Sequence, residues 1–421
     1  MINILYLTYN SVLSSGILKS QVLTLLKNIS ISYPDEFRFV LISYERWNEY
    51  FDYQNKNRLS DELKKYGIKI IFLPKCLPPQ LTSKQNNTFL KWLFNRFAAL
   101  PDMTLMLLAI IGLKFRYRIQ IIQTRSYIPA LIIYKLKKIL KFKILFDPRG
   151  IIPEELSLIH NWSPDNRAFL KWKNREKKLL SASDHVIVLS KPFEKHYQAI
   201  QPNIRTTVVP CAVDTSQFLW NLDWRNEIRT QMGWQDNLLL IYVMGHYVPY
   251  QDFEQVLSFS ETFIQDNPNA MLLVISPDKD KLIQRIEKSS LHKKQWFITE
   301  ASGQYLNKLL CAADCGLLMR VSSLVSVVSS PVKLGEYLAA GLPVLSMPNI
   351  GDTESIVKQY QCGYILHSED PLHDAFQWLN SLRDTSTRMK YVKQSQTAAK
   401  NELSWNHFLP LYVDIYRHLV K

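Results

Sequence analysis

The sequence predicts an α/β fold made of two Rossmann-like domains that face one another across a cleft. A chain of 421 residues is too long for one hydrophobic core and suggests two domains of about 200 residues each. Short apolar strands alternate with helices along the chain, which is typical of parallel sheets covered on both faces. A junction of helix, aspartate and strand occurs twice, in "LLSASDHVIVLS" (179–190) and "LLCAADCGLLMR" (309–320), and indicates two similar halves.

The first half contains five apolar stretches with the length of buried strands, at 3–9, 37–44, 68–74, 119–125 and 142–147. Amphipathic patterns between them predict helices, most clearly at 16–29 and 127–140. A further strand ends at Pro210 and is followed by a polar stretch, so we predict a first domain of residues 1–214.

The alternation resumes in the second half, with predicted strands at 238–245, 270–276 and 295–300 and predicted helices at 254–267 and 281–289. We assign residues 215–398 to a second domain. Residues 399–421 form a terminal segment whose pattern predicts an amphipathic helix interrupted at Pro410.

One short helix in the second half carries an unexpected charge. In "SSPVKLGEYLAAGLPVLSMPN" (329–349), Ser330-Pro331 opens a helix and a glycine closes it. Lys333 lies in its first turn, at the positive end of the helix dipole, where a cation costs about 0.3 kcal/mol. Lys333 and Arg320, at the preceding strand end, are placed to share an anion, and a diphosphate suits two cations. The alternative is a surface pair of Lys333 with Glu336, worth about 0.3 kcal/mol.

Two other loops follow predicted strands and carry candidate site residues. Gly16 lies between the first strand and the first helix, where a ligand can approach the backbone. Asp147 and Arg149, in "FDPRGIIPEE" (146–155), follow a strand that has the pattern of a buried one, together with two glutamates. Charge is costly there unless it is used or paired, so function and a structural Asp147–Arg149 pair explain this cluster equally well.

Several of these stretches together resemble retaining glycosyltransferases of family 4, which have the GT-B fold. Residues 329–349 are similar to the nucleotide-sugar site of that family. Stretches similar to its two domains and terminal helix follow in the family's order: "FDPRGIIPEE", "RAFLKWKNREKKLLSASDHVIVLSKPFEKHY", "VVPCAVDTSQF", "IYVMGHYVPYQDFEQVLSF", "LLCAADCGLLM" and "SWNHFLPLYVDIYRHL".

The resemblance implies a role for several residues. Glu336 is expected to bind the ribose hydroxyls of a nucleoside diphosphate, and Gly245 to let the backbone approach the diphosphate. Gly16 is expected in the loop that faces donor and acceptor. The resemblance further implies that the terminal helix returns to the first domain.

The sequence departs from the family pattern at the sugar contact. The family has a second glutamate eight positions before the ribose-binding one, and Val328 stands there in this chain. Recognition of the sugar then falls to groups near Ser329 and Ser330.

A second departure concerns the diphosphate. The family's usual Arg and Lys after the glycine are replaced by His246, which stays a candidate donor-binding residue, and by Gln251. The phosphate role then shifts to Arg320 and Lys333. In GT-B enzymes, basic groups and a helix N-terminus stabilise the leaving group, so no metal or other cofactor is expected.

The basic residues are concentrated in one segment. The chain has 51 basic and 37 acidic residues and a net charge of +14, and residues 84–143 contain twelve basic residues but one acidic residue. These cations interleave with apolar residues, as in surfaces that bind anionic membranes. We therefore expect residues 84–143 to dock on an anionic membrane, the alternative being a solvated helical face. No nucleic-acid-binding motif is found, so nucleic acid is not an expected partner.

The chain has no pattern of a membrane-spanning or exported protein. The N-terminal "MINILYLTYN" lacks a basic region, and the most apolar run, 103–113, has 11 residues where a span needs about 20. The five cysteines are scattered without a C-x-x-C pair, which favours a reducing compartment. We expect a cytoplasmic protein, peripheral on the inner face of the cytoplasmic membrane.

The sequence as a whole predicts a retaining glycosyltransferase of the hexosyltransferase class. It is expected to transfer a sugar from a nucleoside diphosphate sugar to a glycan or polyprenyl-linked acceptor in cell-surface polysaccharide synthesis. Arg320 and Lys333 would stabilise the leaving diphosphate, and Asp147 and Arg149 would line the acceptor side. The alternatives are a catalytically degenerate scaffold protein, for which Val328 argues, and a nucleotide-sugar 2-epimerase, which needs paired carboxylates and a histidine.

Overall fold

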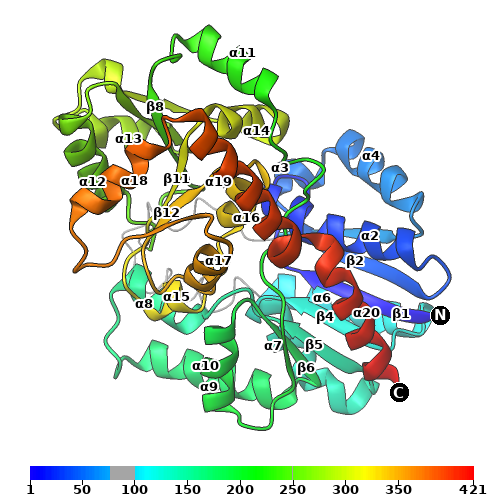
Figure 1. Ribbon diagram of the computed structural model, residues 1–421. Helices are drawn as coiled ribbons and strands as arrows, with labels where there is room; N and C mark the ends of the chain where they lie inside the picture. Colours follow the sequence, from blue (N-terminus) through cyan, green and yellow to red (C-terminus); the bar gives the residue numbers. More distant parts are fainter. Residues whose placement is uncertain (76–99, 249) are drawn as a thin grey trace.

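The computed structural model describes residues 1–75, 100–248 and 250–421 and shows two α/β domains, each built on a parallel sheet (Figure 1). The fold class expected from the alternating pattern is therefore confirmed. Among the described residues, no helix combines the length and apolar character that crossing a membrane would require.

The first sheet has seven parallel strands in the order β3-β2-β1-β4-β5-β6-β7. Side chains along β1 alternate between its faces: Ile4 and Tyr6 enter one hydrophobic cluster, Leu5 and Leu7 the other. Both faces are therefore buried, which explains the continuous apolar runs in the sequence. The strands are β1 (Ile2–Thr8), β2 (Phe37–Glu45), β3 (Lys69–Pro74), β4 (Ile121–Arg125), β5 (Lys143–Asp147), β6 (His185–Val188) and β7 (Thr206–Val208).

Helices cover both faces of this sheet. The stretch predicted as one helix at 16–29 is divided by a π-helical turn, η1 (Lys19–Leu23). The α-helices of this half are α1 (Gly16–Leu18), α2 (Thr24–Ser32), α3 (Trp47–Tyr50), α4 (Tyr53–Lys64), α6 (Leu100–Arg116), α7 (Tyr127–Leu140), α8 (Ile152–His160), α9 (Arg167–Ala182) and α10 (Lys191–Ile200).

The second sheet has six parallel strands in the order β10-β9-β8-β11-β12-β13. As in the first sheet, the order reverses beside the first strand of the sheet. The strands are β8 (Leu238–Val243), β9 (Ala270–Ile275), β10 (Trp296–Thr299), β11 (Cys315–Leu318), β12 (Val344–Ser346) and β13 (Gly363–Ile365). The helices of this half are α11 (Leu222–Met232), α12 (Phe253–Asp266), α13 (Lys279–Ile286), α14 (Gly303–Ala312), α15 (Leu324–Val327), α16 (Val332–Ala339), α17 (Thr353–Tyr360), α18 (Leu372–Ser381) and α19 (Thr385–Ala398), with short turns η2 (Lys293–Gln295) and η3 (Ala399–Leu403).

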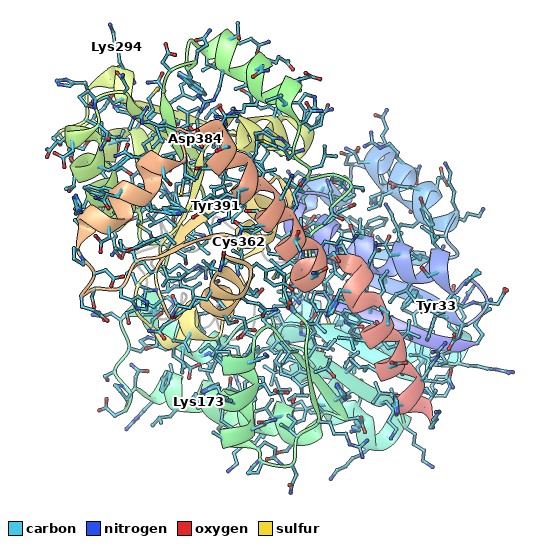
Figure 2. The ribbon with its side chains drawn as sticks, viewed as in Figure 1. Tyr33, Lys173, Lys294, Cys362, Asp384 and Tyr391 are labelled. Carbon is cyan, nitrogen blue, oxygen red and sulfur yellow. The ribbon has the colours of Figure 1, made fainter. Side chains whose placement is uncertain are left out.

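The terminal helix α20 (Trp405–Val420) packs on α2, β1 and β4, far from the second sheet (Figure 1). The helix continues through Pro410, so the predicted interruption is wrong. Pro410 and Asn406 are exposed, and water can bind the carbonyl that the proline leaves without a donor. Near its end, Arg417 donates to both carboxylate oxygens of Glu36 at 2.7 and 2.8 Å and lies over the ring of Tyr33, which is labelled in Figure 2.

The two domains are in direct contact through the segment that follows β11. Val325 and Val328 are buried in the hydrophobic cluster that covers one face of the first sheet. The hydroxyl of Ser190 donates to the carbonyl of Val328 at 3.0 Å, and the backbone N–H of Lys191 donates to Asp352 at 3.0 Å. This contact holds the loops of the second sheet against α8 and α10 of the first domain.

Candidate functional site

The loops after β8 and β11 define the candidate site in the second domain. These two neighbouring strands flank the point where the strand order reverses, and parallel sheets bind ligands at the carboxyl ends of such strands. Gly245 and His246 follow β8, and Arg320 follows β11. The topology thus brings together three of the residues predicted for the donor.

Arg320 is a partly buried cation that forms no direct ion pair with any described residue. Among the described residues, no carboxylate forms an ion pair with its guanidinium group and no hydrogen bond satisfies it. Its one close partner is the ring of Tyr250, whose centroid lies 5.5 Å from the guanidinium carbon. Burial lowers the pKa of Arg320, because removal from water disfavours the charged form. An uncompensated cation in this position favours an anionic ligand.

The helix predicted at 330–341 is α16, and it carries Lys333 and Glu336. Pro331 is its N-cap residue, and Gly341, which follows its end, has a left-handed φ of 72°. Nζ of Lys333 lies 2.7 Å from Oε2 of Glu336. This is the pair that the alternative interpretation described, although Glu336 is 8% exposed rather than on an open surface.

Ser329, Ser330 and Val328 lie where the two domains meet. The hydroxyl of Ser330 accepts a hydrogen bond at 2.9 Å from the backbone N–H of Cys211, and Ser329 donates to the carbonyl of Ser326 at 2.8 Å. Val328 is 1% exposed and packs into the first domain. The valine thus has a packing role at the position of the family's glutamate.

Gly16 and Gly245 both border open space. A Cβ atom at either position would meet no atom within 4 Å, so neither glycine is required by a neighbouring protein group. His246 is exposed, and its Nδ1 lies 3.2 Å from Oδ1 of Asp278, which also accepts from the N–H of Tyr247. These contacts hold the loop after β8 against the loop after β9, which contains Asp278.

Asp147 and Arg149 form a buried ion cluster with Arg125. Oδ1 of Asp147 lies 3.5 Å from Nη1 of Arg149, and Oδ2 lies 3.8 Å from Nη1 of Arg125. Arg149 also donates to Sγ of Cys211 at 3.1 Å. Its φ of 63° is in the left-handed region, which costs energy for a residue with a side chain. The Asp147–Arg149 ion pair that the sequence analysis gave as one of two explanations is therefore present, at the carboxyl ends of β4 and β5.

Sequence reasoning gave no role to Glu155 or Tyr250. Glu155 lies in the first turn of α8, which packs against α15 just after Arg320, and the ring of Tyr250, in the loop after β8, lies 5.5 Å from the guanidinium carbon of Arg320. Burial raises the pKa of Glu155 to about 7, with a smaller contribution from the adjacent Glu154 and an opposing one from Arg320. The only signal in the sequence was the pair of glutamates in "FDPRGIIPEE".

Within the described part of the chain, one group has ligand atoms close enough to hold a metal, namely Glu154, Glu176 and His196. The ammonium group of Lys173 (labelled in Figure 2) donates to both glutamates, at 2.8 Å to Glu154. A lysine that already neutralises these carboxylates opposes a cation there. The expected independence from metals stays a prediction.

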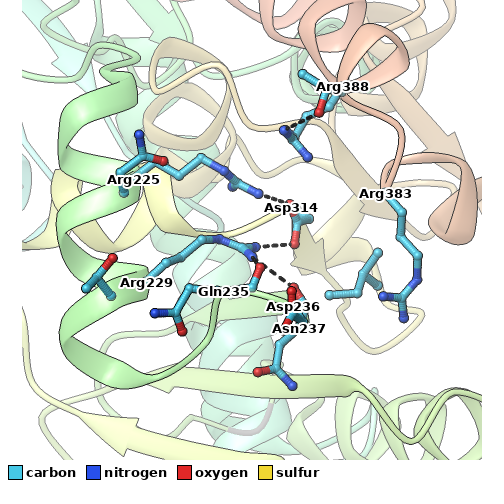
Figure 3. A pocket seen from close by; sticks show the side chains of 12 residues that line it. Arg225, Arg229, Gln235, Asp236, Asn237, Asp314, Arg383 and Arg388 are labelled. Atoms are coloured by element: carbon cyan, nitrogen blue, oxygen red, sulfur yellow. Dashed lines mark hydrogen bonds and ion pairs between the residues drawn. The ribbon is translucent and has the colours of Figure 1, made fainter.

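A polar pocket of about 470 Å³ lies at the opposite, amino-terminal ends of β8 and β11 (Figure 3). Arg225 and Arg229 pair there with Asp314 at 2.5 and 2.6 Å. They also donate to the carbonyls that end α14, so these two arginines have a structural role.

Two family models match the sequence. The model described as Glycosyl transferases group 1 matches residues 225–396, and the model described as Glycosyltransferase Family 4 matches residues 57–217. The first match includes the loops after β8 and β11 and the helix α16. Together with the fold, the two matches support a GT-B glycosyltransferase similar to family 4.

Solved structures show the same fold over the whole chain. Sucrose-phosphate synthase from Thermosynechococcus elongatus is 14% identical, with 100% of this chain and 99% of that chain covered and a TM-score of 0.69. Alr3699/HepE from Anabaena in complex with UDP is 13% identical, with both chains covered to 100% and a TM-score of 0.66. WaaG, a glycosyltransferase involved in lipopolysaccharide biosynthesis, is 12% identical, with 98% and 99% covered and a TM-score of 0.63. No curated protein sequence matches this chain.

Proposed function

We propose that the protein is a retaining glycosyltransferase that moves a hexose from a nucleoside diphosphate sugar to a glycan or polyprenyl-linked acceptor in cell-surface polysaccharide synthesis. The observation that carries the proposal is the uncompensated Arg320 at the carboxyl end of β11, beside the reversal of strand order. UDP is the first nucleotide to test, because structures of HepE contain UDP or UDP-glucose.

The proposed donor site uses charge at one end and hydrogen bonds at the other. Arg320, Lys333 and the N-terminus of α16 neutralise the diphosphate as it leaves, without a metal. Glu336 accepts hydrogen bonds from the ribose hydroxyls. Backbone groups near Ser329 and Ser330 contact the transferred sugar.

Retention follows from attack on the face from which the diphosphate departs. The bond between the anomeric carbon and the phosphate oxygen breaks, the acceptor oxygen bonds to that carbon, and a phosphate oxygen takes the hydroxyl proton. This mechanism needs no protein nucleophile. The anomeric configuration of the product, measured by NMR, distinguishes retention from inversion.

We further propose a cytoplasmic protein that docks on the inner face of the cytoplasmic membrane through an α6–α7 surface, defined by Phe115, Lys135, Lys138, Ile139 and Lys141. Phe115 of α6 and Ile139 of α7 are 70% and 74% exposed, the three lysines on α7 and at its end are exposed as well, and α6 packs against α7. Residues 84–99 of the expected membrane segment lie outside the described residues.

One of the cations counted toward that membrane segment does not belong to the surface. Arg125 is buried next to Asp147 and cannot meet a membrane.

The donor assignment is tested by nucleotide binding to Glu336→Ala. Loss of hydrogen bonds from the ribose to a charged acceptor costs about 1.5–3 kcal/mol, so UDP is expected to bind at least about tenfold more weakly in calorimetry. Glu354→Ala is the control, because Glu354 pairs with Lys358 within α17 as Glu336 pairs with Lys333 within α16. Equal affinity of Glu336→Ala and wild type for UDP contradicts the ribose assignment.

Donor turnover separates the alternatives. Transfer to an acceptor supports the proposal, and conversion of the donor alone points to an epimerase. Binding without either reaction indicates the scaffold protein, for which the buried Val328 remains the best argument.

A further inference from the structure

Glu155 belongs to the first domain, on the helix that packs against the segment after Arg320 in the second domain. It is in the first turn of α8, and α8 packs against α15, the helix that follows Arg320 in the chain. The carboxyl group of Glu155 lies against the backbone of Gly150. A Cβ atom at residue 150 would overlap Oε1 of Glu155. A glycine at 150 is therefore required for this position of the carboxyl group.

The surroundings of Glu155 contain one cation, Arg320, one neighbouring carboxylate, Glu154, and several neutral groups. Arg320 faces it from the second domain without a direct ion pair, and the backbone N–H of Ile151 lies beside the carboxyl. Tyr250 approaches from the loop after β8, and Tyr197 from α10. The facing helix α15 carries no charged residue. Lys173 of α9 forms ion pairs with Glu154 and Glu176.

A diphosphate bound to Arg320 would bring negative charge next to this carboxyl. An ionised Glu155 would then repel the ligand and compete with it for Arg320, whereas a protonated Glu155 could donate a hydrogen bond to a phosphate oxygen. Burial already raises the pKa of Glu155 to about 7, so both forms are populated near neutral pH. A bound anion would raise this pKa further.

We propose that Glu155 is the first domain's contribution to the donor site: when protonated it binds the donor diphosphate beside Arg320, and when ionised it excludes it. This inference rests on the proposed function, and it adds a residue and a pH dependence to it. Because Glu155 is across the domain boundary from Arg320, it also makes donor binding depend on the contact between the domains.

The test is the affinity for UDP-glucose between pH 6 and pH 8.5, measured by calorimetry. A diphosphate diester does not titrate in this range, so the ligand adds no pH dependence of its own. In wild type, the dissociation constant should rise about tenfold per pH unit above pH 7, as the protonated fraction falls. In Glu155→Gln, which keeps the shape and cannot ionise, affinity should be independent of pH and exceed that of wild type at pH 8.5.

A second readout is the proton taken up on binding, from calorimetry in buffers of different ionisation enthalpy. At pH 8, wild type should take up close to one proton with UDP-glucose, and Glu155→Gln none. Glu154→Gln is the matched control: it keeps the pH dependence, with a lower midpoint, because a neighbouring negative charge is removed. A purely structural role of Glu155 would change affinity equally at every pH.

Two outcomes overturn the inference in distinguishable ways. If UDP-glucose and other nucleotide sugars do not bind wild type at any pH, the proposed function and the inference both fail. If UDP-glucose binds wild type and Glu155→Gln with the same pH profile, the inference fails alone.

Discussion

The resemblance to family 4 places Val328 where that family carries a sugar-contacting glutamate, and the surroundings of Val328 explain why a glutamate would not fit there. The side chain is 1% exposed within the hydrophobic cluster of the first domain, and its carbonyl accepts the hydrogen bond from Ser190. The departure from the family pattern is thus part of the contact between the domains.

At the residue scale we predict that Val328→Glu destabilises the protein. An unpaired carboxylate in this cluster should cost about 3 kcal/mol or more, which lowers the melting temperature by roughly 6–12 °C in a thermal unfolding experiment. Leu324→Glu is the control, because Leu324 is 40% exposed in the same segment and should change stability little. A Val328→Glu protein of full stability and higher transferase activity would show that this position still serves the sugar.

The two junctions of helix, aspartate and strand make the same contacts in both domains. Asp184, before β6, accepts from the N–H of Ile144 at 2.8 Å, and its own N–H donates to the carbonyl of Ile144. Asp314, before β11, makes the same two bonds with Leu239. The repeated sequence pattern therefore corresponds to a repeated way of joining adjacent strands.

At the element scale the two aspartates should differ in their contribution to stability. Asp314 is nearly buried and neutralises both Arg225 and Arg229, so Asp314→Asn should cost about 3–5 kcal/mol by leaving buried cations without a partner. Asp184 is more exposed and pairs with Lys137, and Asp184→Asn should cost about 1 kcal/mol. Thermal unfolding of the two variants tests this order, and equal losses would contradict it.

The whole molecule joins the second domain, which contains the candidate site, to a first domain that bears the α6–α7 surface. This surface combines exposed cations with exposed Phe115 and Ile139, and α20 returns from the second domain to the opposite half of the first-domain core. A protein that uses a lipid-linked acceptor would need such a surface beside its acceptor domain.

At this scale we predict salt-dependent binding to vesicles of phosphatidylglycerol and phosphatidylethanolamine. Each cation near an anionic surface contributes about 1 kcal/mol, so Lys135→Ala/Lys138→Ala/Lys141→Ala should bind about 100-fold more weakly in a sedimentation assay at low salt. The control replaces Lys281, Lys288 and Lys294, three exposed lysines of the second domain, by alanine. Equal sedimentation of the two triple variants would locate membrane binding elsewhere.

Much of the fold and part of the candidate site could be predicted because they depend on local chemistry. Alternation of apolar strands and amphipathic helices determines a parallel sheet covered on both faces, and Gly341 marks the end of α16. Lys333, Glu336 and Arg320 were recognisable because they lie at helix starts and strand ends close together in sequence. The π-helical turn and the uninterrupted α20 were missed. Pro410 is tolerated within α20 because the carbonyl that it leaves without a donor belongs to the exposed Asn406 and can bind water.

By itself, the sequence determined the two parallel sheets, the repeated Asp junctions and the positions of Arg320, Lys333 and Glu336 in loops and helix starts. Only the tertiary structure decided that Val328 is buried between the domains, that Arg125 is buried beside Asp147, and that α8, which carries Glu155, packs against α15 after Arg320. The physical reason is the sequence separation over which each effect acts. Hydrophobic periodicity and helix capping depend on residues a few positions apart. Burial and charge pairing between distant segments depend on how the two domains pack.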